Sequence, residues 1–141
     1  MVSVSGLLEC SHRIPCLDYH ALIQLTGILT HSAEDSDQLF RLGCFNFEAR
    51  NTDDHARNFS FLFDDRAGRW QLAPAYDLAP TGPGLREHMT SFFGEGSQIT
   101  ERAIRAATKA MHRGYGELQN EYANIRDTCQ HDLGMYIARR T

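Results

Sequence analysis

The sequence predicts a mainly α-helical domain that carries one small β-hairpin. Residues 33–50 and the last third of the chain place apolar side chains at the three-four spacing of helices buried on one face. Between these segments, two short runs rich in aromatic and aliphatic residues flank a polar turn, as the strands of a hairpin do. The 141 residues are 42% hydrophobic and 23% charged, which is close to the average for globular domains. We therefore expect residues 1–141 to form a single domain.

The first half of the chain predicts two helices after an N-terminal stretch without clear periodicity. Asp18 can cap the first helix, which should end near Gly27. Its apolar residues at helical spacing are Ala21, Leu22, Leu25, Ile28 and Leu29. Ser32 can cap the second helix, over 33–50, where acidic residues in the first turn suit the helix dipole. Phe45 falls outside its apolar face, so this helix should be buried on two sides; that face comprises Leu39, Phe40, Gly43, Cys44 and Phe47.

A polar loop at residues 51–58 leads into the predicted hairpin. Residues 59–63 alternate well enough for a strand, 64–68 form a turn in which Gly68 can adopt positive φ, and 69–73 return. The segment that follows is broken by three prolines, and residues 82–98 look like a glycine-rich loop.

The last third predicts two helices separated by glycines. Thr100 can cap the first, and Gly114 and Gly116 interrupt the pattern before the second. The apolar stripes of the two helices are Ile104, Ala107 and Met111, followed by Leu118, Tyr122, Ile125, Cys129 and Leu133. Such stripes are typical of helices that pack on a core.

Composition excludes several classes of protein. The net charge of −4 and the lack of a basic stripe argue against direct contact with nucleic acid. The four cysteines have no short paired spacing, which disfavours zinc sites and a disulfide framework and suits a reducing cytoplasm; they are Cys10, Cys16, Cys44 and Cys129. No apolar run approaches the roughly 20 residues that cross a bilayer. The N-terminus also lacks the pattern of a signal peptide, so we expect a cytoplasmic protein without membrane contact.

Two polar segments carry residues that neither helices nor strands require. Asp53 is followed five positions later by Asn58, and Asp77 comes just after the hairpin, which should bring the two segments to the same end. Kinases use an Asp as base, and an Asn five residues on and a later Asp to hold Mg²⁺, which prefers hard oxygen ligands. Asp and Asn are also common in turns for local reasons. His55 could either support the loop by hydrogen bonding or take part in catalysis or metal binding.

The motifs resemble those of a known family. T-D-D-H-A-R-N at 52–58, followed by L-A-P-A-Y-D at 72–77, resembles the C-terminal domain of the HipA family. These proteins are toxin serine/threonine kinases of bacterial toxin–antitoxin modules, with a protein-kinase-like fold. The stretches at 7–19 and 87–96 also resemble the family, so the likeness covers about residues 5–137.

The resemblance implies a role for each motif residue. Asp53 would be the catalytic base, and Asn58 and Asp77 would hold Mg²⁺ and with it ATP, while Tyr76 would flank Asp77. Arg57 stands where the family usually has Lys; it keeps the charge but presents a planar fork, so it and His55 are auxiliary candidates. The resemblance further implies a protein substrate, for which the family is associated with an aminoacyl-tRNA synthetase, and an antitoxin as partner.

Two elements of a kinase have no counterpart in the sequence. No glycine-rich loop follows a strand, and Lys109, the single lysine of the chain, lies in a predicted helix far beyond the polar loops. We therefore expect the C-lobe of a HipA-like kinase without its N-lobe. Such a chain should bind ATP weakly and transfer little or no phosphate alone.

Two other functions fit the same residues. The chain could be a non-catalytic, truncated or interaction module that binds an antitoxin or a partner lobe through apolar surface. It could also be a small metal-dependent hydrolase, in which carboxylates and histidines hold two metal ions. The residues for that chemistry would be Asp53, Asp54, His55 and Asp77, with His88 as a further ligand.

Overall fold

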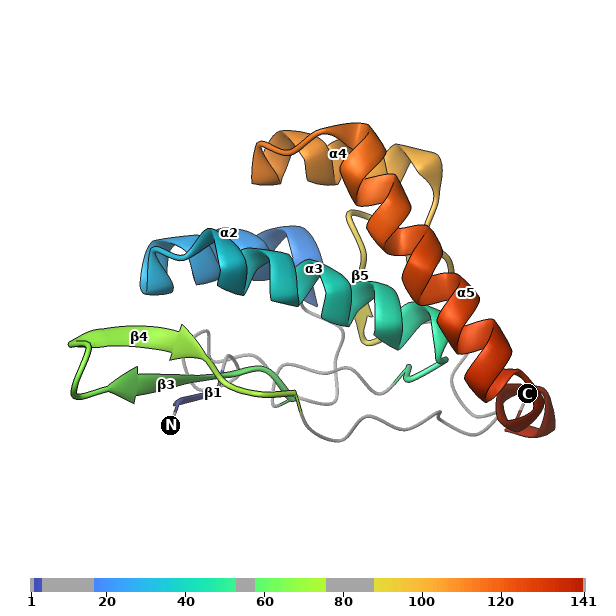
Figure 1. Cartoon of the computed structure of the whole chain (residues 1–141), viewed down its shortest axis with the longest axis horizontal. Coiled ribbons are helices and arrows are strands. Elements are labelled where there is room, and N and C mark those ends of the chain that lie inside the picture. Colours follow the sequence, from blue (N-terminus) through green and yellow to red (C-terminus); the bar gives the residue numbers. More distant parts are fainter. Residues whose placement is uncertain (1, 4–16, 53–57, 76–87, 141) are drawn as a thin grey trace.

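The fold is mainly helical, as the sequence predicts. A computed structural model of the chain describes residues 2–3, 17–52, 58–75 and 88–140. Its elements are β1 (Val2–Ser3), β2 (Leu17–Asp18), α2 (Tyr19–Thr30), α3 (Ala33–Glu48), β3 (Ser60–Asp64), β4 (Arg69–Leu72), β5 (Thr90–Ser91), α4 (Glu101–Met111) and α5 (Tyr115–Arg140). In Figure 1, α2 and α3 form a middle layer between the β3–β4 hairpin and α4, and α5 crosses α3.

Helix α2 begins where the sequence predicts but ends later. The Asp18 side chain caps it by accepting a hydrogen bond from His20 N at 2.7 Å. The helix continues through Gly27 to Thr30, and His31 ends it in the left-handed conformation with φ 52°. A helical glycine costs only about 1 kcal/mol, and Thr30 in the next turn is buried. Ile28, predicted on the apolar face, is 73% exposed because the buried stripe lies on the other side of the helix.

Helix α3 is the central helix and presents the predicted buried face. Ser32 caps it by accepting from Asp35 N at 3.2 Å, and the helix ends at Glu48, two residues before the predicted boundary. Gly43 allows a close approach that no side chain would: a Cβ there would lie 2.9 Å from the Phe92 ring. Phe45, on the opposite side, is only half-buried, so burial on two sides is partial.

The hairpin is confirmed, and the structure adds strands that were not predicted. Strands β3 and β4 pair antiparallel around a turn in which Gly68 has φ 66°, and β1 pairs antiparallel with β3. The sheet order is β1-β3-β4, and β2 pairs separately with β5 in parallel. Strand β5 lies inside 82–98, which the sequence predicts to be loop. Strands of two residues are too short to show an alternating pattern.

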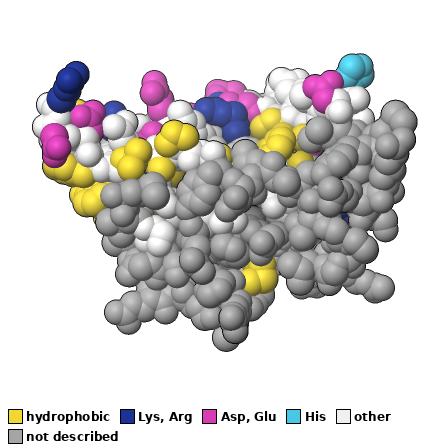
Figure 2. Space-filling model, turned by 90° about the horizontal axis from the view of Figure 1, so that it is seen from below, with side chains coloured by type: hydrophobic (Ala, Val, Ile, Leu, Met, Phe, Trp, Pro, Cys, Tyr) yellow, Lys and Arg dark blue, Asp and Glu magenta, His cyan; other side chains and the backbone are white. Residues whose placement is uncertain are grey.

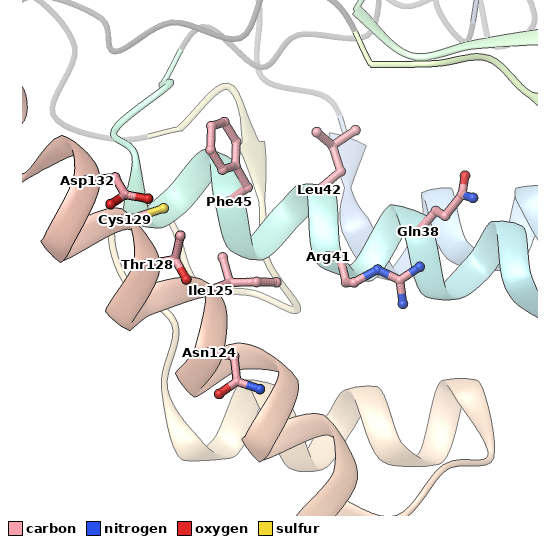
Figure 3. Close-up of a pocket in the computed structure, with 9 residues that line it drawn as sticks. All are labelled: Gln38, Arg41, Leu42, Phe45, Asn124, Ile125, Thr128, Cys129 and Asp132. Atoms are coloured by element: carbon pink, nitrogen blue, oxygen red, sulfur yellow. The ribbon is translucent and has the colours of Figure 1, made fainter.

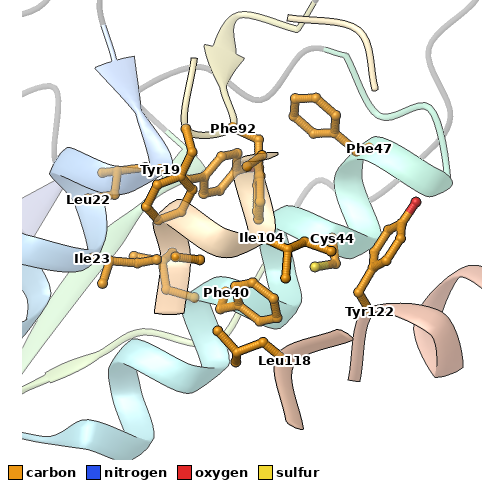
Figure 4. Close-up of a cluster of buried hydrophobic side chains, with 14 of the residues drawn as sticks. Tyr19, Leu22, Ile23, Phe40, Cys44, Phe47, Phe92, Ile104, Leu118 and Tyr122 are labelled. Carbon is orange, nitrogen blue, oxygen red and sulfur yellow. The ribbon is translucent and has the colours of Figure 1, made fainter. Parts of the chain in front are cut away.

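The core lies where α2, α3, α4 and α5 meet, around a cluster of aromatic rings (Figure 4). Fully buried large side chains include Tyr19, Phe40, Phe61, Phe92, Leu22, Leu39, Ile104 and Leu118. The predicted Thr100 cap is confirmed, with its hydroxyl accepting from Ala103 N at 3.2 Å. Both predicted C-terminal stripes supply buried residues.

The visible surface carries mixed charge. Figure 2 shows acidic and basic side chains interspersed along the described edge of one face, with hydrophobic side chains between them. Among the described helices, none is long and apolar enough to span a membrane.

Candidate active site

The described part of the chain includes the residues just before the predicted catalytic loop and one residue of the predicted site, Asn58. Asn58 is half-buried and comes two residues before β3 begins. The predicted base Asp53 and metal ligand Asp77 lie outside the described residues, as do the auxiliary candidates His55 and Arg57. The same holds for Asp54 and Tyr76. The roles of all these residues stay predictions.

The hairpin register brings the start of β3 and the end of β4 to the same end of the sheet. Phe61 lies opposite Leu72, and Ala73 N donates to Ser60 O at 2.9 Å. Asn58 lies two residues before β3, and the described chain continues three residues beyond β4, to Ala75. The expectation that the hairpin returns the chain to its starting end is therefore met as far as the bond between Ala73 and Ser60.

A buried polar network holds the chain just before residue 53. Asn46 Nδ2 donates to the Tyr19 hydroxyl at 2.9 Å, and Asn46 Oδ1 accepts from Asn51 Nδ2 at 3.0 Å. Asn51 N also donates to Asn46 O at 2.9 Å. The chain turns sharply between them, since Arg50 adopts φ 59°. The start of the 51–58 loop is thus tied to both α2 and α3.

Residues 88–96 also contact the chain just before residue 53. Met89 N donates to Thr52 O at 3.1 Å, and the ring of the adjacent His88 stacks on Phe47 with centroids 3.7 Å apart. His88 N donates to Gly96 O at 2.8 Å. Residues 88–96, which resemble the family in sequence, therefore form a support for the loop.

Asp18 fixes that support to the start of α2. Its Oδ1 accepts from Phe93 N at 3.0 Å, and its Oδ2 accepts from Gly94 N and from Ser91 Oγ, each at 2.7 Å. Together with the cap bond to His20 N, the carboxylate accepts four hydrogen bonds. The sequence shows the capping role of Asp18 but not its contacts to residues more than 70 positions away.

The hydrolase hypothesis depends mainly on Asp53, Asp54, His55 and Asp77, which lie outside the described residues. No group of three or more His, Cys, Asp or Glu residues in the described part of the chain could hold a metal ion. His88, its only described member, is buried and stacked on Phe47, which is the setting of a packed ring. Lys109 lies exposed in the last turn of α4.

Figure 3 shows a groove between two of the helices. It lies between α3 and α5 and has a volume of about 680 Å³, and Asn58, the described residue of the predicted kinase site, is not among its lining residues. Its lining residues are Gln38, Arg41, Leu42, Phe45, Asn124, Ile125, Thr128, Cys129 and Asp132.

The buried thiol and hydroxyl groups between α3 and α5 are unreactive. Burial, with smaller contributions from Glu48 and Glu121, raises the pKa of the Cys44 thiol well above its usual range. Burial and then the 2.7 Å hydrogen bond to Glu48 raise the pKa of the Tyr122 hydroxyl. Both groups therefore stay protonated at neutral pH and are poor nucleophiles.

Sequence reasoning missed Asn46 and Asn51 as supports of the site. One signal was present: Asn46 stands between Phe45 and Phe47, near the end of an otherwise apolar helix face. A buried amide in such a place needs hydrogen-bond partners.

Solved structures define the class of fold. The chain superposes on HipA from Shewanella oneidensis MR-1, solved in complex with HipB and its operator DNA, with a TM-score of 0.67. The match covers 86% of this chain at 16% sequence identity, and the chain spans 29% of that protein's length. This likeness shows that the two share a fold.

Sequence comparison then identifies the family. Residues 1–133 match the HipA-like C-terminal domain. The chain therefore belongs to the HipA-like C-terminal domain family, as the motifs at 52–58 and 72–77 suggest. A search of curated proteins finds no match.

Proposed function

We propose that this chain is the catalytic C-lobe of a HipA-like toxin serine/threonine kinase. Asp53 would accept the proton of the substrate hydroxyl, while Asn58 and Asp77 would hold Mg²⁺ against the phosphates of ATP. The match of residues 1–133 to the HipA-like C-terminal domain carries the proposal, because it includes both motifs in order.

The donor set fits magnesium. An amide oxygen from Asn58 and a carboxylate from Asp77 are the hard ligands that Mg²⁺ prefers. Asn58 comes two residues before β3, next to the end of the sheet to which the hairpin returns the chain. A bound Mg²⁺ would neutralise charge on the phosphates, and the protein would position the hydroxyl and the base.

Phosphoryl transfer also needs groups outside this set. A glycine-rich loop covers the phosphates in kinases and a strand lysine engages them. The single lysine, Lys109, lies exposed on α4, a helix that packs mainly on α5 and α2. We propose that a partner lobe supplies both elements, and that a protein substrate and an antitoxin complete the system. The Shewanella HipA structure, which holds HipB of the same toxin–antitoxin system, supports the antitoxin.

The chain alone should transfer little or no phosphate when it is incubated with labelled ATP and Mg²⁺. Ligands for the metal without a phosphate clamp hold ATP too weakly for efficient transfer. Incorporation of label into the chain or an added protein measures this. Robust labelling that disappears in Asp53→Asn but persists in the matched control Asp54→Asn would contradict the expected inactivity and support the site.

One alternative has support of its own. The chain could act as an interaction module that binds an antitoxin or partner lobe without catalysis. Two large apolar side chains, Ile28 and Phe63, are 73% and 49% exposed, and the groove between α3 and α5 is open. Such a module would need no metal ligands, so metal binding separates the two functions.

A further inference from the structure

Asn46 is a polar residue in an apolar setting. It lies on α3 beside Phe47, and only 2% of its surface is exposed. Its side chain uses its donor and its acceptor on two different elements, the Tyr19 hydroxyl on α2 and Asn51 beyond the helix end. Asn51 is itself 3% exposed.

An apolar side chain at position 46 could contribute similar stability without any need for hydrogen-bond partners. Burying an amide is unfavourable unless it is hydrogen-bonded, and an apolar side chain of similar volume packs without that requirement. Unlike apolar contacts, the hydrogen bonds of Asn46 to Tyr19 and Asn51 have fixed geometry, so they set the path of the chain after the helix ends. Arg50, with its φ of 59°, shows that this path is a sharp turn.

The path leads directly to the predicted base. Asn51 is followed by Thr52, whose carbonyl accepts from Met89 N at 3.1 Å, and Thr52 is followed by Asp53. The last two residues before Asp53 are therefore held from two sides, by Asn46 and by the 88–96 segment. Position matters here because small displacements of a base or ligand reduce phosphoryl transfer strongly.

We propose that Asn46 is a positioning residue, which fixes Asn51 and Thr52 and thereby the start of the segment that carries Asp53 and leads to Asn58. The role in catalysis rests on the proposed function, whereas the fixing of Asn51 and Thr52 is testable without it. The described partners of the Asn46 side chain are Tyr19 and Asn51, so Asn46 would act through the backbone that follows it.

Amide hydrogen exchange measured by NMR tests the fixing. In Asn46→Leu, the amides of Asn51 and Met89 should exchange at least about tenfold faster, because both report whether the chain stays in place. The amide of Ile104, bonded to Thr100 O at 3.1 Å on α4, should change much less. Thr26→Val is the matched control: it removes another buried polar group, bonded within α2 at 2.8 Å, and should affect the three amides alike.

A metal probe tests the consequence for the site. Added Mn²⁺ should broaden the side-chain amide signals of Asn58 in the wild-type chain, and Asn46→Leu should weaken this effect about tenfold, as the loss of supports of metal ligands commonly does. Thr26→Val should not. If Mn²⁺ fails to broaden Asn58 in the wild type, the proposed metal site is wrong, while the exchange rates still decide the positioning role.

Two outcomes would overturn the inference. One is an Asn46→Leu variant whose Asn51 and Met89 amides exchange as in the wild type. The other is uniform acceleration, with Ile104 affected equally, because that pattern means general destabilisation. If Asn46→Leu does not fold, Tyr19→Phe removes only the hydroxyl partner of Asn46, and a rise of about threefold confined to Asn51 and Met89 is expected; no rise would contradict the proposal.

Discussion

Replacing Phe47 by alanine should lower the free energy of unfolding by about 3–5 kcal/mol. Phe47 is 6% exposed and its ring meets three others: that of His88 at 3.7 Å, that of Phe92 at 5.8 Å and that of Tyr19 at 6.4 Å between centroids. The truncation removes buried apolar surface and leaves a cavity between α3 and the 88–96 segment. Urea unfolding followed by far-ultraviolet circular dichroism measures the change.

Phe63→Ala is the matched control for this experiment. Phe63 is 49% exposed at the hairpin and its ring contacts that of Trp70 at 5.4 Å between centroids, so its truncation should cost only about 1–2 kcal/mol. A cost under about 1 kcal/mol for Phe47→Ala would mean that the face of α3 toward His88 is not packed as described.

Replacing Asp18 by alanine should lower the free energy of unfolding by about 2–4 kcal/mol. The loss combines a helix cap, worth about 0.5–2 kcal/mol, with charge-assisted bonds worth about 1.5–3 kcal/mol. These bonds join α2 to Phe93, Gly94 and Ser91. The same urea titration measures the change.

Two further variants serve as controls for Asp18→Ala. Asp65→Ala removes an exposed carboxylate in the hairpin turn and should stay within about 0.5 kcal/mol of the wild type. Asp18→Asn keeps the cap acceptor but turns an NH₂ group toward donors, so it should fall between wild type and Asp18→Ala. Asp18→Ala as stable as Asp65→Ala would contradict the contacts assigned to this carboxylate.

The helices were predictable because their signals are local. The caps Asp18, Ser32 and Thr100 each lie within three residues of the amide they bond, so the sequence next to the helix contains the information. The hairpin is local for the same reason, with Gly68 at the residue that needs positive φ.

Features that depend on distant contacts were not predictable. Strand β5 exists because it pairs with β2, more than 70 residues earlier, and no two-residue sequence reveals that. Ile28 matches the helical period yet is exposed, since only the packing of α2 on its neighbours decides which side is buried. The Asn46 network likewise joins residues 27 positions apart.

The candidate site was found by a different route. Asp53, Asn58 and Asp77 came from spacing and from family resemblance, and the family is now shown over residues 1–133. The structure adds contacts in the described residues next to these segments: a hairpin that bonds Ala73 to Ser60, and bonds to Asn51 and Thr52 from Asn46 and Met89. Spacing alone carries no information on such supports, since Tyr19 and Met89 lie far from the motif in the chain.

Titrating the chain with Mn²⁺ in the presence of ADP, followed by electron paramagnetic resonance, tests the central claim most directly. The account predicts a weak site in the wild type whose affinity falls at least about tenfold in Asn58→Ala and in Asp77→Asn, since each removes a ligand. Asp65→Asn, a control on the hairpin turn, should bind as the wild type does. A wild type without a site, or Asn58→Ala and Asp77→Asn variants that bind Mn²⁺ as tightly as the wild type, would contradict the proposal that this chain is the metal-binding half of a kinase.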